Sequence, residues 1–196
     1  MRPLALAHIG WIDSLVRAGI VDSTKIGLLG HSHGALAAYG LLATTRRFRA
    51  AAIINGPSDI LHEYAGVVAS NIESAFAGEW GTTGFLAFES TEFGGGLHIG
   101  ATPWQSPDKW ARNNPINHID RVEAPLMLVH ADNDVYDLSQ ATVAFRSLHR
   151  LGRRVRYVRY WGEAHTIESP SNIRDLWTRL YAWFKGYLCE ARCEVM

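Results

Sequence analysis

The stretch Ile26-Gly27-Leu28-Leu29-Gly30-His31-Ser32-His33-Gly34-Ala35-Leu36-Ala37 decides how this chain folds. An apolar run ends in Gly-x-Ser-x-Gly, and an alanine-rich helical pattern follows at once. This is the strand–turn–helix context of a nucleophile elbow, in which a tight and strained turn exposes the serine hydroxyl. We expect Gly30 and Gly34 to leave room for close packing around the turn. The helix that begins near His33 directs its free N–H groups towards the same point, so Ser32 is the candidate nucleophile.

Apolar runs and helical periodicities alternate along the rest of the chain. Buried or half-buried strands are predicted at residues 25–30, 50–55, 125–130 and 154–161. The last of these alternates basic and apolar residues, which is typical of an edge strand. Helices are predicted at 4–18, 33–44, 141–151 and 173–188, with weaker helical patterns at 60–68 and 72–76 and a loop at 92–102. This alternation predicts an α/β fold, a parallel sheet flanked by helices, in a single domain over residues 1–196.

The composition excludes several classes of protein. The 196 residues are 47% hydrophobic and 19% charged, which is typical of a folded domain. The 19 basic residues balance the 19 acidic ones, so neither nucleic acid nor an anionic membrane is an expected partner. Cys189 and Cys193 form neither a disulfide framework nor a zinc motif. No apolar run is long enough to span a bilayer and no signal peptide is evident, so we expect a cytoplasmic protein.

Three chemically suitable side chains follow predicted strands, in the order Ser32, Asp134 and His165. The carboxyl ends of parallel strands meet at one edge of a sheet, so these side chains are expected to lie together. His165 would take the proton of Ser32, and Asp134 would orient the imidazole. The order Ser, Asp, His is that of α/β-hydrolases. The backbone N–H of His33 is the expected oxyanion donor.

Other residues near these positions offer alternatives. Asp132 shares the acidic turn with Asp134 and is the second candidate for the triad acid. Asp137 fits better as the cap of the following helix, with Gln140 as its reciprocal partner. Two histidines flank the serine, but no third metal ligand is evident in the sequence. We therefore expect no metal and no cofactor.

Several of these segments together resemble the prolyl oligopeptidase family of serine peptidases, and most closely its dipeptidyl-peptidase and acylaminoacyl-peptidase branches. The resemblance is carried by Val21-Asp22-x-x-Lys25-Ile26-Gly27, Gly30-His31-Ser32-His33-Gly34, Pro125-Leu126-Met127-Leu128-Val129-His130-Ala131-Asp132-Asn133-Asp134 and Tyr160-Trp161-Gly162-Glu163-Ala164-His165. It covers nearly the whole chain. It implies the C-terminal half of an α/β-hydrolase fold, cleavage of short peptides by the triad, and a pocket for the residue before the cut bond lined by residues from Ser58 to Tyr64.

The chain also departs from the family pattern. His33-Gly34-Ala35 stands where the family often has Tyr-Gly-Gly, and Asp137-Leu138 replaces the usual Val-Pro after the acid. In the family, further strands, a loop that supplies a second oxyanion donor, often a tyrosine hydroxyl, and an N-terminal propeller precede the part resembled here. We therefore expect a partial, N-terminally truncated catalytic domain.

The leading functional hypothesis is a serine peptidase that hydrolyses short peptides. The first alternative is a carboxylesterase or lipase, because the same triad serves acyl transfer from esters. The second is an inactive truncated fragment. We also expect the strand at 25–30 to have a partner only on the side of 50–55, leaving Trp11 partly exposed. An apolar edge of this kind favours association, so a homo-oligomer joined through it is predicted.

Overall fold

The computed structural model describes residues 2–65 and 99–189, without the side chains of residues 2–6. Some of the sequence predictions lie outside the described residues: the helical pattern at 72–76, the end of the pattern at 60–68, and most of the loop at 92–102. Cys193 lies outside them as well. The elements in chain order are α1 (Arg2–Arg17), β1 (Ile26–His31), α2 (Gly34–Thr44), β2 (Phe48–Ile54), α3 (Ile60–Ala65), α6 (Pro107–Asn113), the 3-10 helix η2 (Pro115–Arg121), β3 (Leu126–Ala131), α7 (Ser139–Arg150), β4 (Val155–Tyr160) and α8 (Pro170–Leu188).

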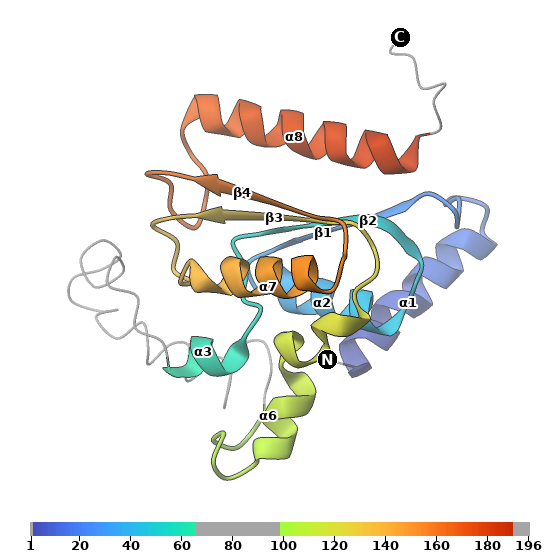
Figure 1. Cartoon of the computed structure of the whole chain (residues 1–196). Coiled ribbons are helices and arrows are strands. Elements are labelled where there is room, and N and C mark those ends of the chain that lie inside the picture. Colours follow the sequence, from blue (N-terminus) through green and yellow to red (C-terminus); the bar gives the residue numbers. More distant parts are fainter. Residues whose placement is uncertain (1, 66–98, 190–196) are drawn as a thin grey trace.

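The four strands form one parallel sheet in the order β1-β2-β3-β4 (Figure 1), which confirms the predicted α/β architecture. Helix α8 covers one face, and α1, α2 and α7 lie on the other. Within the described residues β1 pairs only with β2, and β4 only with β3, so both expected edge positions are confirmed. On β1 the side chain of Leu29 is 48% exposed. Association through this edge stays a prediction.

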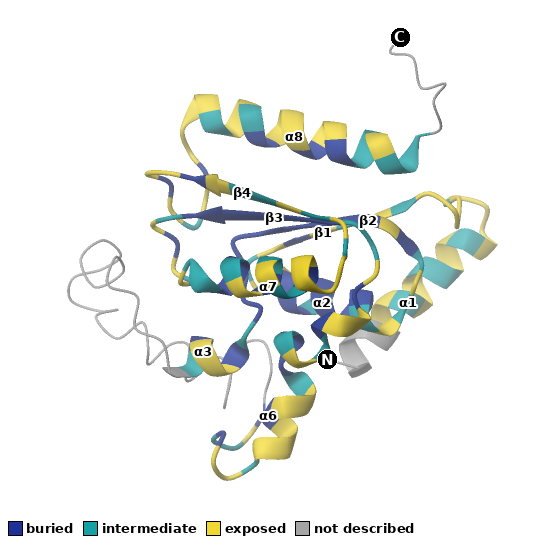
Figure 2. Cartoon of the chain, viewed as in Figure 1, coloured by how far each residue is buried: buried dark blue, intermediate teal, exposed yellow. Residues whose placement is uncertain are grey.

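Strand β2 shows how the sequence builds two cores from one sheet. Its residues point alternately to opposite faces, as the pleat of a strand requires. Ala51 and Ile53 pack with α2, η2 and α7, whereas Ala52 and Ile54 pack under α8. The indole of Trp183 in α8 donates a hydrogen bond to the Ala51 carbonyl at 2.9 Å. Apart from Arg49, strands β2 and β3 are therefore buried on both faces, while α1, α7 and α8 expose their outer sides (Figure 2).

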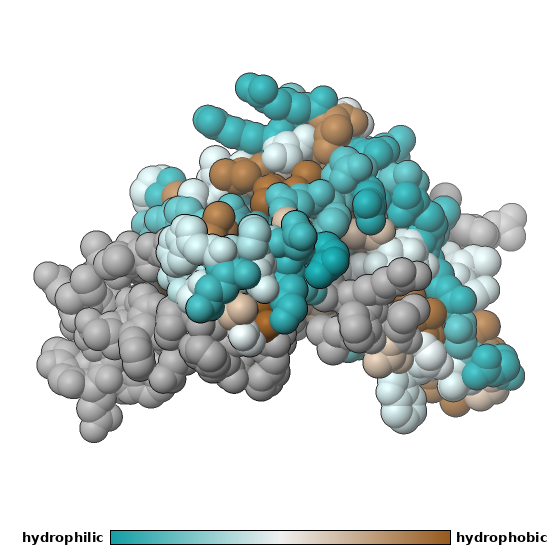
Figure 3. Space-filling view, turned by 90° about the horizontal axis from the view of Figure 1, so that it is seen from below, coloured by the Kyte–Doolittle hydropathy of each residue, from teal (hydrophilic) through white to brown (hydrophobic). Residues whose placement is uncertain are grey.

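The surface helices explain what remains exposed. Helix α1 packs against α2 through Ile9 and Ile12, and Trp11 on its other side is 74% exposed, as the sequence predicts. On the face seen from below, apolar residues reach the surface in separate patches between hydrophilic ones (Figure 3). No helix within residues 2–65 and 99–189 is long and apolar enough to cross a membrane.

The predicted cap of α7 is only half right. Asp137 does accept the backbone N–H of Ser139, with 2.8 Å between nitrogen and Oδ1. Gln140 does not return the interaction. It is buried, and its Oε1 accepts the backbone N–H groups of Ser58 at 2.8 Å and Asp59 at 2.7 Å. Helix α7 is thereby tied to the segment that follows β2.

Candidate active site

The turn after β1 holds Ser32 in a conformation that side chains rarely adopt. Its φ is 58°, in the left-handed region, which costs about 1–3 kcal/mol and persists only where the surrounding structure enforces it. A Cβ at Gly30 would lie 2.6 Å from the Gly34 carbonyl oxygen, and one at Gly56 would lie 2.2 Å from the Cβ of Ala35. A Cβ at Gly34 would meet nothing within 4 Å, so the predicted packing role of Gly34 is wrong. Gly30 and Gly56 allow the close approach instead.

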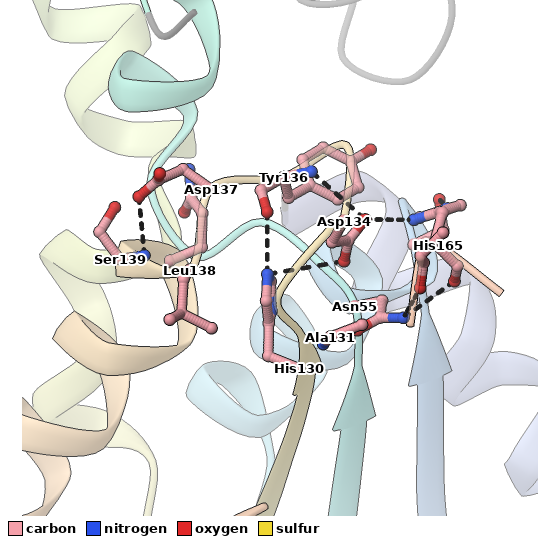
Figure 4. A network of polar contacts seen from close by, with 12 residues as sticks. Asn55, His130, Ala131, Asp134, Tyr136, Asp137, Leu138, Ser139 and His165 are labelled. Carbon is pink, nitrogen blue, oxygen red and sulfur yellow. Dashed lines mark hydrogen bonds and ion pairs between the residues drawn. The ribbon is translucent and has the colours of Figure 1, made fainter. Parts of the chain in front are cut away.

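The loop that carries His165 is held against the end of β2 by Asn55. This residue is fully buried and has a φ of 45°, which asparagine tolerates better than most residues. Its Nδ2 donates to the carbonyls of Ala164 at 3.2 Å and His165 at 2.9 Å, and its Oδ1 accepts the Ala131 N–H at 2.8 Å (Figure 4). One amide, at the end of β2, therefore connects the last residue of β3 with the loop that follows β4.

The structure brings together the three residues predicted as a triad. His165 Nε2 lies 2.9 Å from Ser32 Oγ, and His165 Nδ1 lies 2.7 Å from Asp134 Oδ1. The Asp134 side chain is completely buried, whereas that of His165 is 28% exposed. Since a buried carboxylate facing Nδ1 favours the tautomer with its proton there, Nε2 is left as the acceptor for the serine proton.

The geometry favours Asp134 over Asp132 as the partner of His165. Asp134 Oδ1 also accepts the Tyr136 N–H at 3.3 Å, and its Oδ2 faces His130 Nε2 at 3.5 Å (Figure 4). His130 in turn contacts the Tyr136 carbonyl at 2.9 Å. Asp132 instead accepts the Gly162 N–H at 2.6 Å and so anchors the loop that carries His165.

A second polar group, which no pattern in the sequence indicates, lies beside Ser32. The hydroxyl of Tyr136 is 3.4 Å from His33 Nδ1, and the Tyr136 ring lies edge-on to His165 with the ring centroids 5.6 Å apart. His33 Nε2 lies 3.6 Å from Glu63 Oε1. The neighbouring Glu63 carboxylate raises the pKa of His33 above its usual range, and burial raises the pKa of Tyr136. Only proximity in three dimensions joins these residues, because they come from three separate segments.

The remaining predicted site residues are placed less directly. The N–H of His33 takes part in none of the turn and loop backbone hydrogen bonds between described residues, so it is available to an oxyanion. Tyr64 is half-buried and packs edge-on against Trp104 and Trp110. Ser58 is completely buried, and its hydroxyl donates to the Gln140 carbonyl at 2.6 Å. We therefore assign Ser58 to holding this segment, and a pocket-lining role remains a prediction for Tyr64.

Among the described residues, no group of three or more His, Cys, Asp or Glu side chains is arranged so that it could hold a metal ion. His31 contacts the His165 carbonyl at 3.1 Å, with the two rings 4.9 Å apart. His33 faces Glu63 instead. The two histidines beside the serine thus belong to different contacts.

Comparison with known proteins decides the family. The sequence profile of the prolyl oligopeptidase family matches residues 8–83 and 74–190, which together cover most of the chain. The chain belongs to the prolyl oligopeptidase family. Among curated relatives, the acylamino-acid-releasing enzyme 2 of Oryza sativa subsp. japonica is 24% identical over 182 residues. That match covers 90% of this chain and 22% of the rice protein.

Solved structures of prolyl oligopeptidase relatives share the fold. A puromycin-hydrolyzing peptidase of Mycobacterium tuberculosis is 22% identical with a TM-score of 0.77, over 95% of this chain and 25% of that one. An acylaminoacyl peptidase of Pyrococcus horikoshii is 22% identical with a TM-score of 0.73, over 95% of this chain and 28% of that one. The chain therefore has the α/β-hydrolase architecture of these peptidases and spans about a quarter of their length.

Proposed function

We propose that this chain carries the catalytic triad of a serine peptidase that hydrolyses short peptides, with Ser32, His165 and Asp134 as its members. The observation that carries the proposal is the continuous chain of hydrogen bonds from Ser32 Oγ to His165 and on to buried Asp134. Family membership supports the same reaction class. A serine at its ordinary pKa is a poor nucleophile, and this arrangement supplies the base that it lacks.

The proposed reaction follows from the geometry. Ser32 Oγ attacks the carbonyl carbon of the substrate while its proton passes to His165 Nε2. The resulting oxyanion accepts the free His33 N–H, and Asp134 stabilises the imidazolium. His165 then gives the proton to the amine that leaves, and an acyl-enzyme remains on Ser32. Water, deprotonated by His165, adds to this ester and releases the acid, which restores the serine.

The first experiment tests whether Ser32 is activated. A fluorophosphonate probe reacts with activated serines, so we expect it to label the purified chain and not its Ser32→Ala variant. Ser139→Ala is the matched control, because Ser139 is a surface serine outside the triad and its loss should leave labelling unchanged. Labelling that is absent, or equal in Ser32→Ala, in protein shown to be folded by circular dichroism would refute the proposal.

A second experiment separates peptidase from esterase. The same triad serves esters, so substrates of both kinds are compared on one preparation. We expect turnover of aminoacyl and N-acyl-aminoacyl anilides that is lost in Ser32→Ala. Turnover of short acyl esters, with none of any anilide or peptide, would favour the carboxylesterase alternative.

A further inference from the structure

The pair formed by His33 and Glu63 is placed as a charged group beside the reaction centre. The Glu63 side chain is only 3% exposed, and its Oε2 has no hydrogen-bond partner among the described residues. A buried carboxylate without such partners favours a cation next to it. His33 Nε2 supplies that position at 3.6 Å from Glu63 Oε1, and the Glu63 carboxylate raises the pKa of His33.

The other ring nitrogen of His33 points at Tyr136. Its Nδ1 lies 3.4 Å from the Tyr136 hydroxyl. The Tyr136 ring lies edge-on to both His33 and His165, with centroids 6.1 and 5.6 Å away. Packing between the two histidines thus fixes where the hydroxyl lies, and burial raises its pKa so that it keeps its proton.

The protonation state of His33 decides what the Tyr136 hydroxyl does. When His33 is neutral with its proton on Nε2 towards Glu63, Nδ1 accepts the tyrosine O–H. When His33 is charged, Nδ1–H donates to the tyrosine oxygen, and the O–H is free to donate elsewhere. Both histidines that the Tyr136 ring contacts adjoin Ser32: His33 follows it in the chain, and His165 Nε2 lies 2.9 Å from Ser32 Oγ, the atom to which the substrate carbonyl becomes bonded.

We propose that Tyr136 is a catalytic hydrogen-bond donor to the oxyanion formed at Ser32, and that Glu63 and His33 are positioning residues that free its hydroxyl for this role. The inference rests on the proposed function. The groups that face His33 and Tyr136 are Glu63 from α3, and Asp134 and His165 from the loops after β3 and β4. His62 of α3 contacts Asp137 and Ser139 instead, and His31 contacts His165.

Steady-state kinetics of Tyr136→Phe tests the donor role. Removing one oxyanion donor costs about 100- to 1000-fold in kcat, so we expect a loss of about 100-fold with KM within about twofold. Tyr160→Phe is the matched control, since it removes a hydroxyl that is bonded to Asp175 and lies outside the site. Its kcat should equal that of the unsubstituted chain. A Tyr136→Phe variant that keeps normal kcat would overturn the inference.

The pH profile tests the positioning role. Activity should fall at alkaline pH as His33 loses its proton, and Tyr136→Phe should lack this alkaline limb. Glu63→Gln removes the charge that raises the pKa of His33, so its limb should move to lower pH. An NMR titration of His33 should show the same downward shift without reference to activity. If the alkaline limb of the pH profile is unchanged in both Tyr136→Phe and Glu63→Gln, the positioning role of Glu63 and His33 is wrong.

These experiments distinguish failure of the role proposed for Tyr136 from failure of the proposed serine peptidase function. Absence of Ser32-dependent turnover in the unsubstituted chain would refute both proposals together. Ser32-dependent turnover with a normal Tyr136→Phe would refute only the role of the tyrosine. Circular dichroism melting of each variant identifies a loss of activity that comes from unfolding.

Discussion

Ser32 lies between two histidine–carboxylate pairs that use the same residue types in different geometries. His165 and Asp134 are 2.7 Å apart, and the far ring nitrogen of His165 is 2.9 Å from the serine. His33 and Glu63 are 3.6 Å apart, and a tyrosine hydroxyl separates the far nitrogen of His33 from the serine. The first pair has the distances that proton transfer requires. The second is suited to holding a charge, so distance rather than residue type assigns the role.

The two pairs also differ in the secondary-structure elements that hold them in place. Asp134 and His165 follow adjacent strands, and Asn55 ties their loops to a third strand end. His33 is the N-cap residue of α2, and Glu63 belongs to the short helix α3. A site built on several strand ends is positioned by the sheet, whereas the second pair depends on how one short helix packs. The following predictions test this difference in order of expected effect.

The largest effect is expected for the first pair and its serine. Ser32→Ala and His165→Ala should each lower kcat by about a million-fold, because groups that act as one unit fail together. The double variant should be no worse than either single one, as measured by kcat with an anilide substrate. Losses that multiply in the double variant would show that the two residues act independently.

The next largest effect is expected for the acid. Asp134→Asn should lower kcat by about ten-thousand-fold, because an amide at this position stabilises the wrong tautomer of His165. Asp132→Asn is the matched control in the same turn, and its effect should be far smaller because Asp132 only anchors Gly162. An inactive Asp132→Asn variant together with an active Asp134→Asn variant would move the role of triad acid to Asp132.

A smaller effect, on stability, is expected at the loop that carries His165. Glu163 accepts hydrogen bonds from Ser169, Glu168 and Asn172, which lower its pKa from 4.5 to about 2. A lowered pKa stabilises the fold above pH 4.5, and this stabilisation is lost as the pH falls towards 2. Glu163→Gln should melt about 5 °C lower at pH 7 and lack this acid dependence.

The control for this measurement is Glu168→Gln, since the Glu168 side chain is exposed while its backbone N–H still reaches Glu163. Thermal melts between pH 2 and 7 follow both variants. Equal acid profiles for Glu163→Gln and the unsubstituted chain would contradict the prediction.

The smallest effect is expected for the stability contributed by the second pair. The raised pKa of His33 stabilises the fold below its ordinary value of 6.5, and this stabilisation is lost as the pH rises through the folded pKa. Glu63→Gln should therefore differ in melting temperature from the unsubstituted chain by about 2 °C more at pH 5.5 than at pH 9.

Glu123→Gln is the matched control for the second pair. Its carboxylate pairs with Arg46 at the surface, and arginine does not titrate in this range. Its melting difference should be the same at pH 5.5 and pH 9. A pH-independent difference for Glu63→Gln as well would contradict a charged His33.

The sequence was sufficient for the features that depend on local pattern. The elbow, the alternation of strands and helices, and the order Ser32, Asp134, His165 follow from periodicity and from the rule that parallel strands end at one edge. Tyr136 and Glu63 were not predicted, because their approach to Ser32 depends on how separate loops pack. Gln140 was misread for the same reason, since its partners lie in the segment after β2.

The glycines near Ser32 show the same limit of prediction from sequence. Gly34 belongs to the motif and was expected to matter for packing, whereas Gly56 lies outside it. The structure places Ala35 and the Ser32 carbonyl against Gly56 and leaves Gly34 open. A motif gives the residues near the serine in sequence, but the steric requirement falls on whichever backbone segment the fold brings next to it.

The order of strands in the sheet has a consequence for the chain while it is being made. The strands lie in the sheet in the order in which they are synthesised. Ser32 is made 133 residues before His165, the histidine proposed to activate it. At about 5–20 residues per second the ribosome needs roughly 7 to 27 seconds for that interval. Asn55 is likewise synthesised 110 residues before His165, whose carbonyl accepts its hydrogen bond. Until His165 has been made, the serine therefore remains an ordinary alcohol, and the proposed hydrolysis cannot begin.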